Sequence, residues 1–279
     1  MFSRNIDCSE RMIEVIREAG IIPLFRSAVP GWSIEDLTVP GCWFDDNDEG
    51  ILGPWDWKVD AVQQGDIAYG KFLGGKAGFA TPQWYAHLMN WRRSIPKYRI
   101  AEGGRYKAAT NSEKLMKILS PVALQAIRDA GALGSKEIRL ICSSKITESQ
   151  IRSMGASYKK LLSPTIKKNV MDSTLQFLQM GTWSLVGDIE RVYRGPELKY
   201  SGWQLASNTT PEALFGKASN TVSEVPSAAA PSWAKRFEEP SEQAFRLPDC
   251  SPKESREALI DHVRSIFPDA DRSSLVKIF

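Results

Sequence analysis

The chain has 279 residues, of which 42% are apolar, and its 36 Lys or Arg against 33 Asp or Glu give a net charge of +3. This apolar content supports one large or two medium-sized cores, which argues against a disordered chain, and no long apolar run predicts a transmembrane helix. Only two histidines are present, the N-terminal stretch MFSRNIDCSERMIEV is charged throughout, and the cysteines lie far apart, at Cys8, Cys42, Cys142 and Cys250. We therefore expect a cytoplasmic protein with no secretory signal, disulfide framework, zinc site or membrane partner.

The first part of the chain predicts three helices in succession. Apolar side chains at helical spacing predict a helix over residues 9–19, which ends at Gly20. A second helix is expected to start at Ser33, a favoured N-cap residue. A third begins at Pro54, which fits the first turn of a helix, and ends at Gly65.

A β-hairpin and a further helix follow the third helix. Residues 66–80 read as two short strands around Gly74-Gly75, a favoured hairpin turn, and the next helix starts at Thr81 and Pro82. A helix followed directly by a hairpin is what a winged-helix domain supplies, with the helix in the major groove of DNA and the hairpin against the backbone.

The same order of elements recurs further along the chain. Residues 112–130 predict a helix with a break at Pro121, and residues 134–142 a short second helix. Residues 163–181 predict a long helix with Pro164 in its first turn, followed by two strands joined at 195–198. We predict a mostly helical α+β fold with tandem winged-helix domains that carry small antiparallel β-hairpin wings, over residues 1–108 and 109–216.

The last part of the chain differs in composition from the rest. Residues 217–250 begin with a small, polar stretch containing prolines and predict a linker or long loop. Residues 251–279 predict a C-terminal helical segment in which Leu259, Val263 and Ile266 share one face. This face either docks back on the body of the protein or binds a partner protein.

Charge is unevenly distributed along the chain. Residues 35–66 contain nine acidic residues and one basic residue, whereas residues 91–168 contain seventeen basic and five acidic residues. A basic block of this size is either a solvated face or a surface that faces phosphates.

The tetrapeptide Trp55-Asp56-Trp57-Lys58 is the candidate site of chemistry. A carboxylate at a helix N-terminus is stabilised by the helix dipole, so Asp56 stays ionised and can orient water or stabilise a developing cation. An indole offers a face on which an unpaired base can stack. The alternative is that Asp56 only complements the helix dipole while both indoles fill the core.

Candidate DNA contacts come from basic residues interleaved with glycines and aromatic residues. Cations suited to phosphates are Lys58, Lys71, Lys76, Arg92, Arg93, Lys159, Lys160, Lys167 and Lys168. Glutamine reads adenine edges or lines a pocket, which makes Gln176 and Gln179 candidates as well. For each of these side chains the alternative is a solvated surface position.

Several segments together resemble a known family. They are AGIIPLF at 19–25, GPWDWK at 53–58, AYGKFLGGKAGF at 68–79, NWRR at 90–93, LQMGTW at 178–183, Asp188, and SGWQLASNTTPEALFG at 201–216. In this order they resemble the AlkZ-related winged-helix proteins, distant relatives of the AlkZ-like DNA glycosylases. The resemblance implies tandem winged-helix units with a concave basic channel for duplex DNA.

The same resemblance bears on the chemistry. In the glycosylase relatives, a Gln-x-Gln or Gln-x-Asp motif positions the water that cleaves an N-glycosidic bond. The chain contains no Gln-x-Gln, and its nearest candidates are Asp56 and the pair Gln176 and Gln179. We therefore predict a double-stranded DNA-binding protein with glycosylase-like repair activity on alkylated bases, without metal or cofactor. The alternative is a non-catalytic DNA-binding regulator or protein-interaction module.

Overall fold

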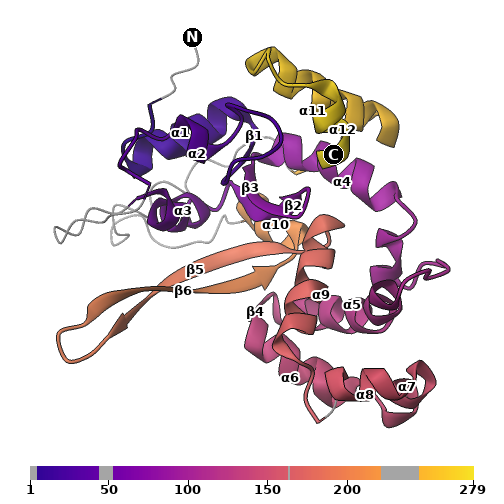
Figure 1. The fold of residues 1–279 in the computed structure, drawn as a ribbon. Coiled ribbons are helices and arrows are strands. Elements are labelled where there is room, and N and C mark those ends of the chain that lie inside the picture. Colours follow the sequence, from indigo (N-terminus) through magenta and orange to yellow (C-terminus); the bar gives the residue numbers. More distant parts are fainter. Residues whose placement is uncertain (1–4, 44–52, 163, 221–244) are drawn as a thin grey trace.

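The computed structural model describes residues 5–43, 53–162, 164–220 and 245–279 of the chain (Figure 1). Most of its elements are helices and its strands pair antiparallel, so the predicted α+β, mostly helical class is confirmed. Most of the predicted linker, residues 221–244, lies outside the described residues.

In the first part of the chain, the described residues form α1 (Ser9–Ala19), β1 (Ile21–Pro23), α2 (Ile34–Leu37), α3 (Pro54–Gln63), β2 (Ala68–Leu73), β3 (Lys76–Ala80) and α4 (Pro82–Ser94). Gly20 ends α1 at a φ of 67°, a conformation that glycine adopts without steric cost. Pro54 stands in the first turn of α3, and the β2–β3 turn uses Gly74 and Gly75 at φ values of 58° and 82°. The predicted elements are confirmed in this part of the chain.

The second part begins with a short 3-10 helix (Tyr98–Glu102). It continues with α5 (Asn111–Ala130), β4 (Ala132–Gly134), α6 (Ser135–Lys145), α7 (Glu148–Met154), α8 (Ala156–Leu162), α9 (Lys168–Met180), β5 (Leu185–Arg194), β6 (Lys199–Thr209) and α10 (Pro211–Asn220). Because α10 extends to Asn220, the first residues of the predicted linker 217–250 are helical.

Two predicted helix features in the second part are wrong. Helix α5 runs without a break through Pro121, because Leu119, Ala123 and Leu124 are buried on its core face and their packing offsets the lost backbone hydrogen bond. Helix α9 begins at Lys168, so Pro164 is not in its first turn.

One antiparallel sheet connects both parts of the chain, in the strand order β1-β3-β2-β5-β6-β4. Within each part the first strand pairs with the last, β1 with β3 and β4 with β6. Strands β2 and β5 join the two parts through the pair Tyr69 and Val186. The two hairpins, predicted as separate small wings, are therefore neighbours in one sheet.

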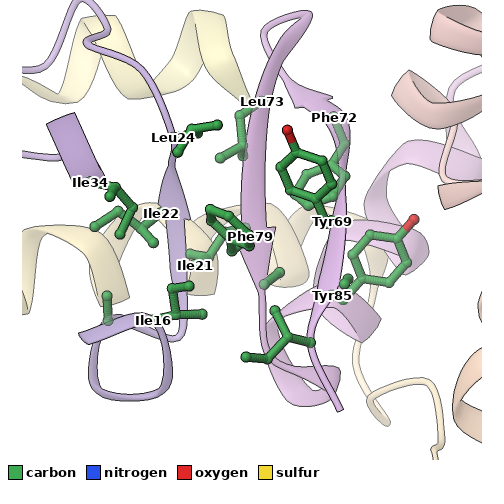
Figure 2. Close-up of a cluster of buried hydrophobic side chains, with 14 of the residues drawn as sticks. Ile16, Ile21, Ile22, Leu24, Ile34, Tyr69, Phe72, Leu73, Phe79 and Tyr85 are labelled. Carbon is green, nitrogen blue, oxygen red and sulfur yellow. The ribbon is translucent and has the colours of Figure 1, made fainter. Parts of the chain in front are cut away.

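The buried apolar side chains form two clusters. The larger one packs against β1, β2 and β3, where Ile21, Ile22, Tyr69, Phe72 and Phe79 meet (Figure 2). The smaller one lies between α5, α6, α8 and α9. Burial on this scale is the main favourable contribution to folding.

The C-terminal helices α11 (Pro252–Ile266) and α12 (Arg272–Ile278) pack on α4 (Figure 1). Leu259 and Val263 are fully buried in the larger cluster, and the indole of Trp91 donates to the carbonyl of Phe279 at 2.6 Å. The apolar face of α11 thus docks back on the body of the protein, which is the first of the two alternatives that the sequence left open. No helix among the described residues is long and apolar enough to cross a membrane.

Candidate functional site

The carboxylate of Asp56 lies where the first part of the chain meets the second. Asp56 is in the first turn of α3, and two side chains of β6 donate to its Oδ1, the hydroxyl of Tyr200 and the amide of Gln204 at 2.9 Å. The amide of Gln204 also lies 3.0 Å from the Tyr200 hydroxyl. Within the described residues, Oδ2 of Asp56 accepts no hydrogen bond. One oxygen is therefore fixed and the other is available to a water or a ligand.

Arg191 of β5 links helix α3 to the hairpin formed by β5 and β6. Its guanidinium donates to the carbonyl of Asp56 and to Oδ1 of Asp60, both at 3.0 Å. Asp60 also accepts from the hydroxyl of Ser9 in α1 at 2.9 Å. These contacts hold α3 against β5, so the position of Asp56 depends on the second hairpin as well as on its own helix.

Lys58 is buried beside Asp56, with only 4% of its surface exposed. Its ammonium lies 3.3 Å from the centre of the Trp55 ring and donates to the Trp55 carbonyl. Burial lowers the pKa of Lys58 to about 7, although the charge of Asp56 acts in the opposite direction. The structure thus assigns Lys58 to the interior of the site, and not to the phosphate-facing surface predicted from the sequence.

The two indoles of the tetrapeptide have different surroundings. Trp57 is buried in the larger cluster, whereas Trp55 is 38% exposed and lies 6.3 Å from the ring of Phe25. The predicted core role therefore applies to Trp57, whereas Trp55 stays partly exposed with the ammonium of Lys58 over its ring.

This arrangement supports a limited chemistry. A fixed carboxylate with one unpaired oxygen can orient a water molecule or offset positive charge on a reacting group. The described residues contain no group of three His, Cys, Asp or Glu side chains that could hold a metal ion.

Most of the predicted phosphate-binding lysines are exposed. Lys71 lies on β2, and the others gather on α8 and at the start of α9, at Lys159, Lys160, Lys167 and Lys168. Lys76 is also exposed, but its ammonium donates to the carbonyl of Arg26.

The two arginines predicted to contact DNA bind other residues of the protein instead. Arg92 is 6% exposed and donates to the carbonyl of Ile278 in α12. Arg93 pairs with Glu212 at 2.6 Å and donates to the carbonyl of Thr182 at 2.8 Å. Both arginines therefore connect parts of the fold, and a phosphate would have to displace these partners.

The predicted glutamines of α9 face the first hairpin. Gln179 is 7% exposed, and its side chain accepts from the backbone N–H of Lys71 at 2.8 Å and donates to Asn208 at 3.2 Å. Gln176 donates to the carbonyl of Gly75 at 3.3 Å. These contacts join α9 to the sheet, and neither glutamine lies beside Asp56 in a shared hydrogen-bond network.

The residues that hold Asp56 were not among the predicted site residues. Tyr200 and Gln204 are four positions apart on β6, and alternation along a strand puts such residues on one face. The sequence carries that signal, but it does not show which helix the strand covers. The sequence also contains a Gln-x-Asp spacing, at Gln64 and Asp66. In the structure, the carboxylate of Asp66 forms an ion pair with Arg17 at 3.0 Å.

Comparison with known proteins identifies one family. The family model described as AlkZ related matches residues 6–279, which is nearly the whole chain. No curated protein and no solved structure matches the chain.

Proposed function

We propose that this chain, which belongs to the AlkZ-related family, binds duplex DNA and hydrolyses the N-glycosidic bond of an alkylated base at Asp56. The observation that carries the proposal is the carboxylate of Asp56, held by Tyr200 and Gln204 on one oxygen and unpaired on the other among the described residues. The proposed chemistry uses neither a metal nor a cofactor.

The repeated order of elements supports the DNA-binding half of the proposal. We assign winged-helix units to residues 1–108 and 109–216, because each has helices followed by a hairpin whose last strand pairs with the unit's first strand. In such a unit the helix before the hairpin enters the major groove. Helices α3 and α9 hold that position here.

The exposed lysines support contact with the DNA backbone. Lys159 and Lys160 on α8 stand close in sequence to Lys167 and Lys168 at the start of α9, which is the end that a recognition helix presents to DNA. Each lysine that neutralises a phosphate releases counterions, so the affinity for DNA falls as salt rises.

The chemistry follows from the charge of the leaving group. An alkylated purine leaves readily because it is already cationic, so the reaction needs an oriented water and some stabilisation of the sugar cation. The free Oδ2 of Asp56 suits both tasks. The base must first leave the helical stack, and we assign its stacking to Trp55, which is 38% exposed.

The proposal is tested with Asp56→Asn in a base-release assay on duplex DNA that contains a methylated purine. Asparagine keeps the acceptor for Tyr200 and Gln204 but loses the anionic oxygen. We expect excision to fall by roughly 100-fold or more, while DNA affinity changes by less than about threefold. Glu190→Gln, at an exposed position on β5, is the matched control and should keep full activity. Undiminished excision by Asp56→Asn would refute the assignment.

A second function is favoured by one observation. The hydrogen bonds to Asp56 also lock β6 onto α3, which is a sufficient structural role for this carboxylate in a non-catalytic DNA-binding regulator. In that case the unchanged protein releases no base, and Asp56→Asn lowers thermal stability without any effect on chemistry.

A further inference from the structure

Both histidines of the chain lie where α11 packs on α4 (Figure 1). His87 belongs to α4 and His262 to α11, and each imidazole stacks with the indole of Trp84 in α4. The ring centroids lie 3.7 Å apart for His262 and 5.4 Å apart for His87. Helix α11 is therefore attached to α4 through a cluster of three rings, and two of these rings can gain a proton near neutral pH.

His262 also contacts the end of α1. Its Nε2 lies 2.9 Å from the carbonyl oxygen of Ala19, the last residue of that helix. Because a carbonyl oxygen only accepts, Nε2 carries the hydrogen and Nδ1 of the neutral ring does not. Gly20 makes room for this contact, since a Cβ at that position would clash with the Trp84 ring and lie 2.8 Å from Nε2 of His262. The stacked rings thus pack directly against the backbone of α1.

His87 contacts the start of α11 through a buried hydroxyl. Its Nδ1 lies 3.3 Å from Oγ of Ser255, which is fully buried. The same oxygen accepts from the amide of Asn90 at 2.9 Å and lies 3.2 Å from the thiol of Cys250. A neutral His87 can accept the Ser255 hydroxyl hydrogen at Nδ1, whereas the protonated ring can only donate there. Protonation therefore removes an acceptor from a buried hydrogen-bond network.

The surroundings also oppose a positive charge on either ring. Burial lowers the pKa of His87. Burial likewise lowers the pKa of His262; its hydrogen bond to the Ala19 carbonyl acts in the opposite direction, and the charge of His87 adds to the lowering. Two charges in this interface would thus be desolvated and would repel each other.

Charged residues on the neighbouring helices do not compensate these charges. Neither imidazole forms an ion pair with a carboxylate among the described residues, because the carboxylates close to them in the chain have other partners. On α4 the nearest cations, Arg92 and Arg93, are held by Ile278 and Glu212. The pairs on α1 and α11 are Arg17 with Asp66, Arg11 with Glu18, Arg272 with Glu257 and Asp261, and Glu254 with the backbone of Ser251.

We propose that the two histidines make the docking of α11 on α4 sensitive to pH, so that protonation of both rings releases α11. The rings bind protons less readily in the docked state than in the released state, so docking weakens as pH falls below about 6.5. Release would uncover Leu259 and Val263, which are fully buried in the docked state. The proposal depends neither on DNA binding nor on Asp56.

The test is hydrogen exchange of the full chain at pH 7 and pH 5, with each rate divided by that of an unstructured peptide at the same pH. We expect the protection of α11 to fall by about threefold or more at pH 5, relative to that of α5 in the smaller cluster. Global unfolding affects both helices, so this ratio isolates the release of α11.

The double variant His87→Gln and His262→Gln should lose this fall, because glutamine keeps an N–H donor but does not titrate. Arg264→Gln, at an exposed position on α11, is the control and should keep the fall. NMR titration of the unchanged protein gives the pKa of each imidazole directly, and it decides the question if the double variant does not fold.

We expect both imidazoles of the unchanged protein to titrate below pH 6.5. A pKa of 6.5 or more for either ring would overturn the proposal. So would protection of α11 that does not fall in the unchanged protein, or that falls equally in the double variant.

Discussion

The side chains of Trp55, Asp56 and Trp57 are consecutive in the sequence but lie in different environments, some in the candidate site and one in the hydrophobic core. Trp57 turns into the larger cluster, Trp55 keeps an exposed face, and Asp56 reaches toward β6. Lys58, the next residue along the helix, is buried with its ammonium over the Trp55 ring. The motif is therefore both a structural junction and the candidate site.

The burial of Lys58 has a consequence for the pH dependence of stability. Its pKa is about 7 in the folded protein and about 10.5 in the unfolded chain, so the unfolded chain binds more protons between these values. Stability should therefore rise as pH increases from about 7 toward 10, by roughly 5 kcal/mol at most for this residue.

The variant Lys58→Met tests this dependence through urea unfolding at pH 7 and pH 9.5. We expect the difference in stability between the two pH values to be smaller in Lys58→Met than in the unchanged protein, because methionine does not titrate. Lys71→Met, at an exposed position, should leave the difference unchanged. Equal pH dependence in all three proteins would contradict the buried, low-pKa lysine.

Gln179 is a second residue whose role follows from its partners. It links the backbone of Lys71 in β2 to Asn208 in β6, so Gln179→Leu leaves a backbone N–H and a side-chain amide without partners. We expect a loss of about 2–3 kcal/mol in the free energy of unfolding. Gln83→Leu on the surface of α4 is the control, with an expected change below about 0.5 kcal/mol. A loss in Gln179→Leu no larger than in the control would show that the link is not stabilising.

At the scale of elements, local signals predicted most of the first part of the chain. Gly20, Pro54 and the Gly74-Gly75 turn each determine local backbone geometry, and each marks the boundary that the structure shows. Predictions failed where tertiary packing outweighs local preference, as in the continuous helix through Pro121.

The two residues that bind the Asp56 carboxylate could not be predicted from local sequence patterns. Asp56 was recognisable because a carboxylate near a helix N-terminus has a direct physical meaning. Tyr200 and Gln204 lie more than 140 positions away, at sequence separations of 144 and 148, and only the pairing of two hairpins in one sheet brings them to α3. A single sequence does not show that pairing.

The C-terminal helix α11 offers a test at the scale of an element. Leu259 is fully buried between α11 and the larger cluster, so Leu259→Ala should lower the free energy of unfolding by about 2–5 kcal/mol. Lys253→Ala, at an exposed position in the first turn of the same helix, should change it by less than about 0.5 kcal/mol. Denaturant unfolding measures both. A cost at Leu259 below about 1 kcal/mol would mean that α11 is only loosely attached in solution.

At the scale of the whole molecule, the single sheet joins the first part of the chain to the second. Lys71 belongs to the first part, and the exposed lysines of α8 and α9 belong to the second. Under the proposed function, one DNA duplex contacts both groups of lysines. We therefore predict that the two groups contribute to one binding event.

The measurement that tests this account most directly is the salt dependence of affinity for a short DNA duplex. The unchanged protein is compared with a variant in which Lys159, Lys160, Lys167 and Lys168 are glutamine. Each phosphate contact contributes a slope of roughly −0.9 to the log–log plot of affinity against salt. We predict steep salt dependence for the unchanged protein and a slope shallower by about two units or more in the variant. The absence of binding at low salt, or equal slopes for the two proteins, would contradict the claim that these lysines contact DNA.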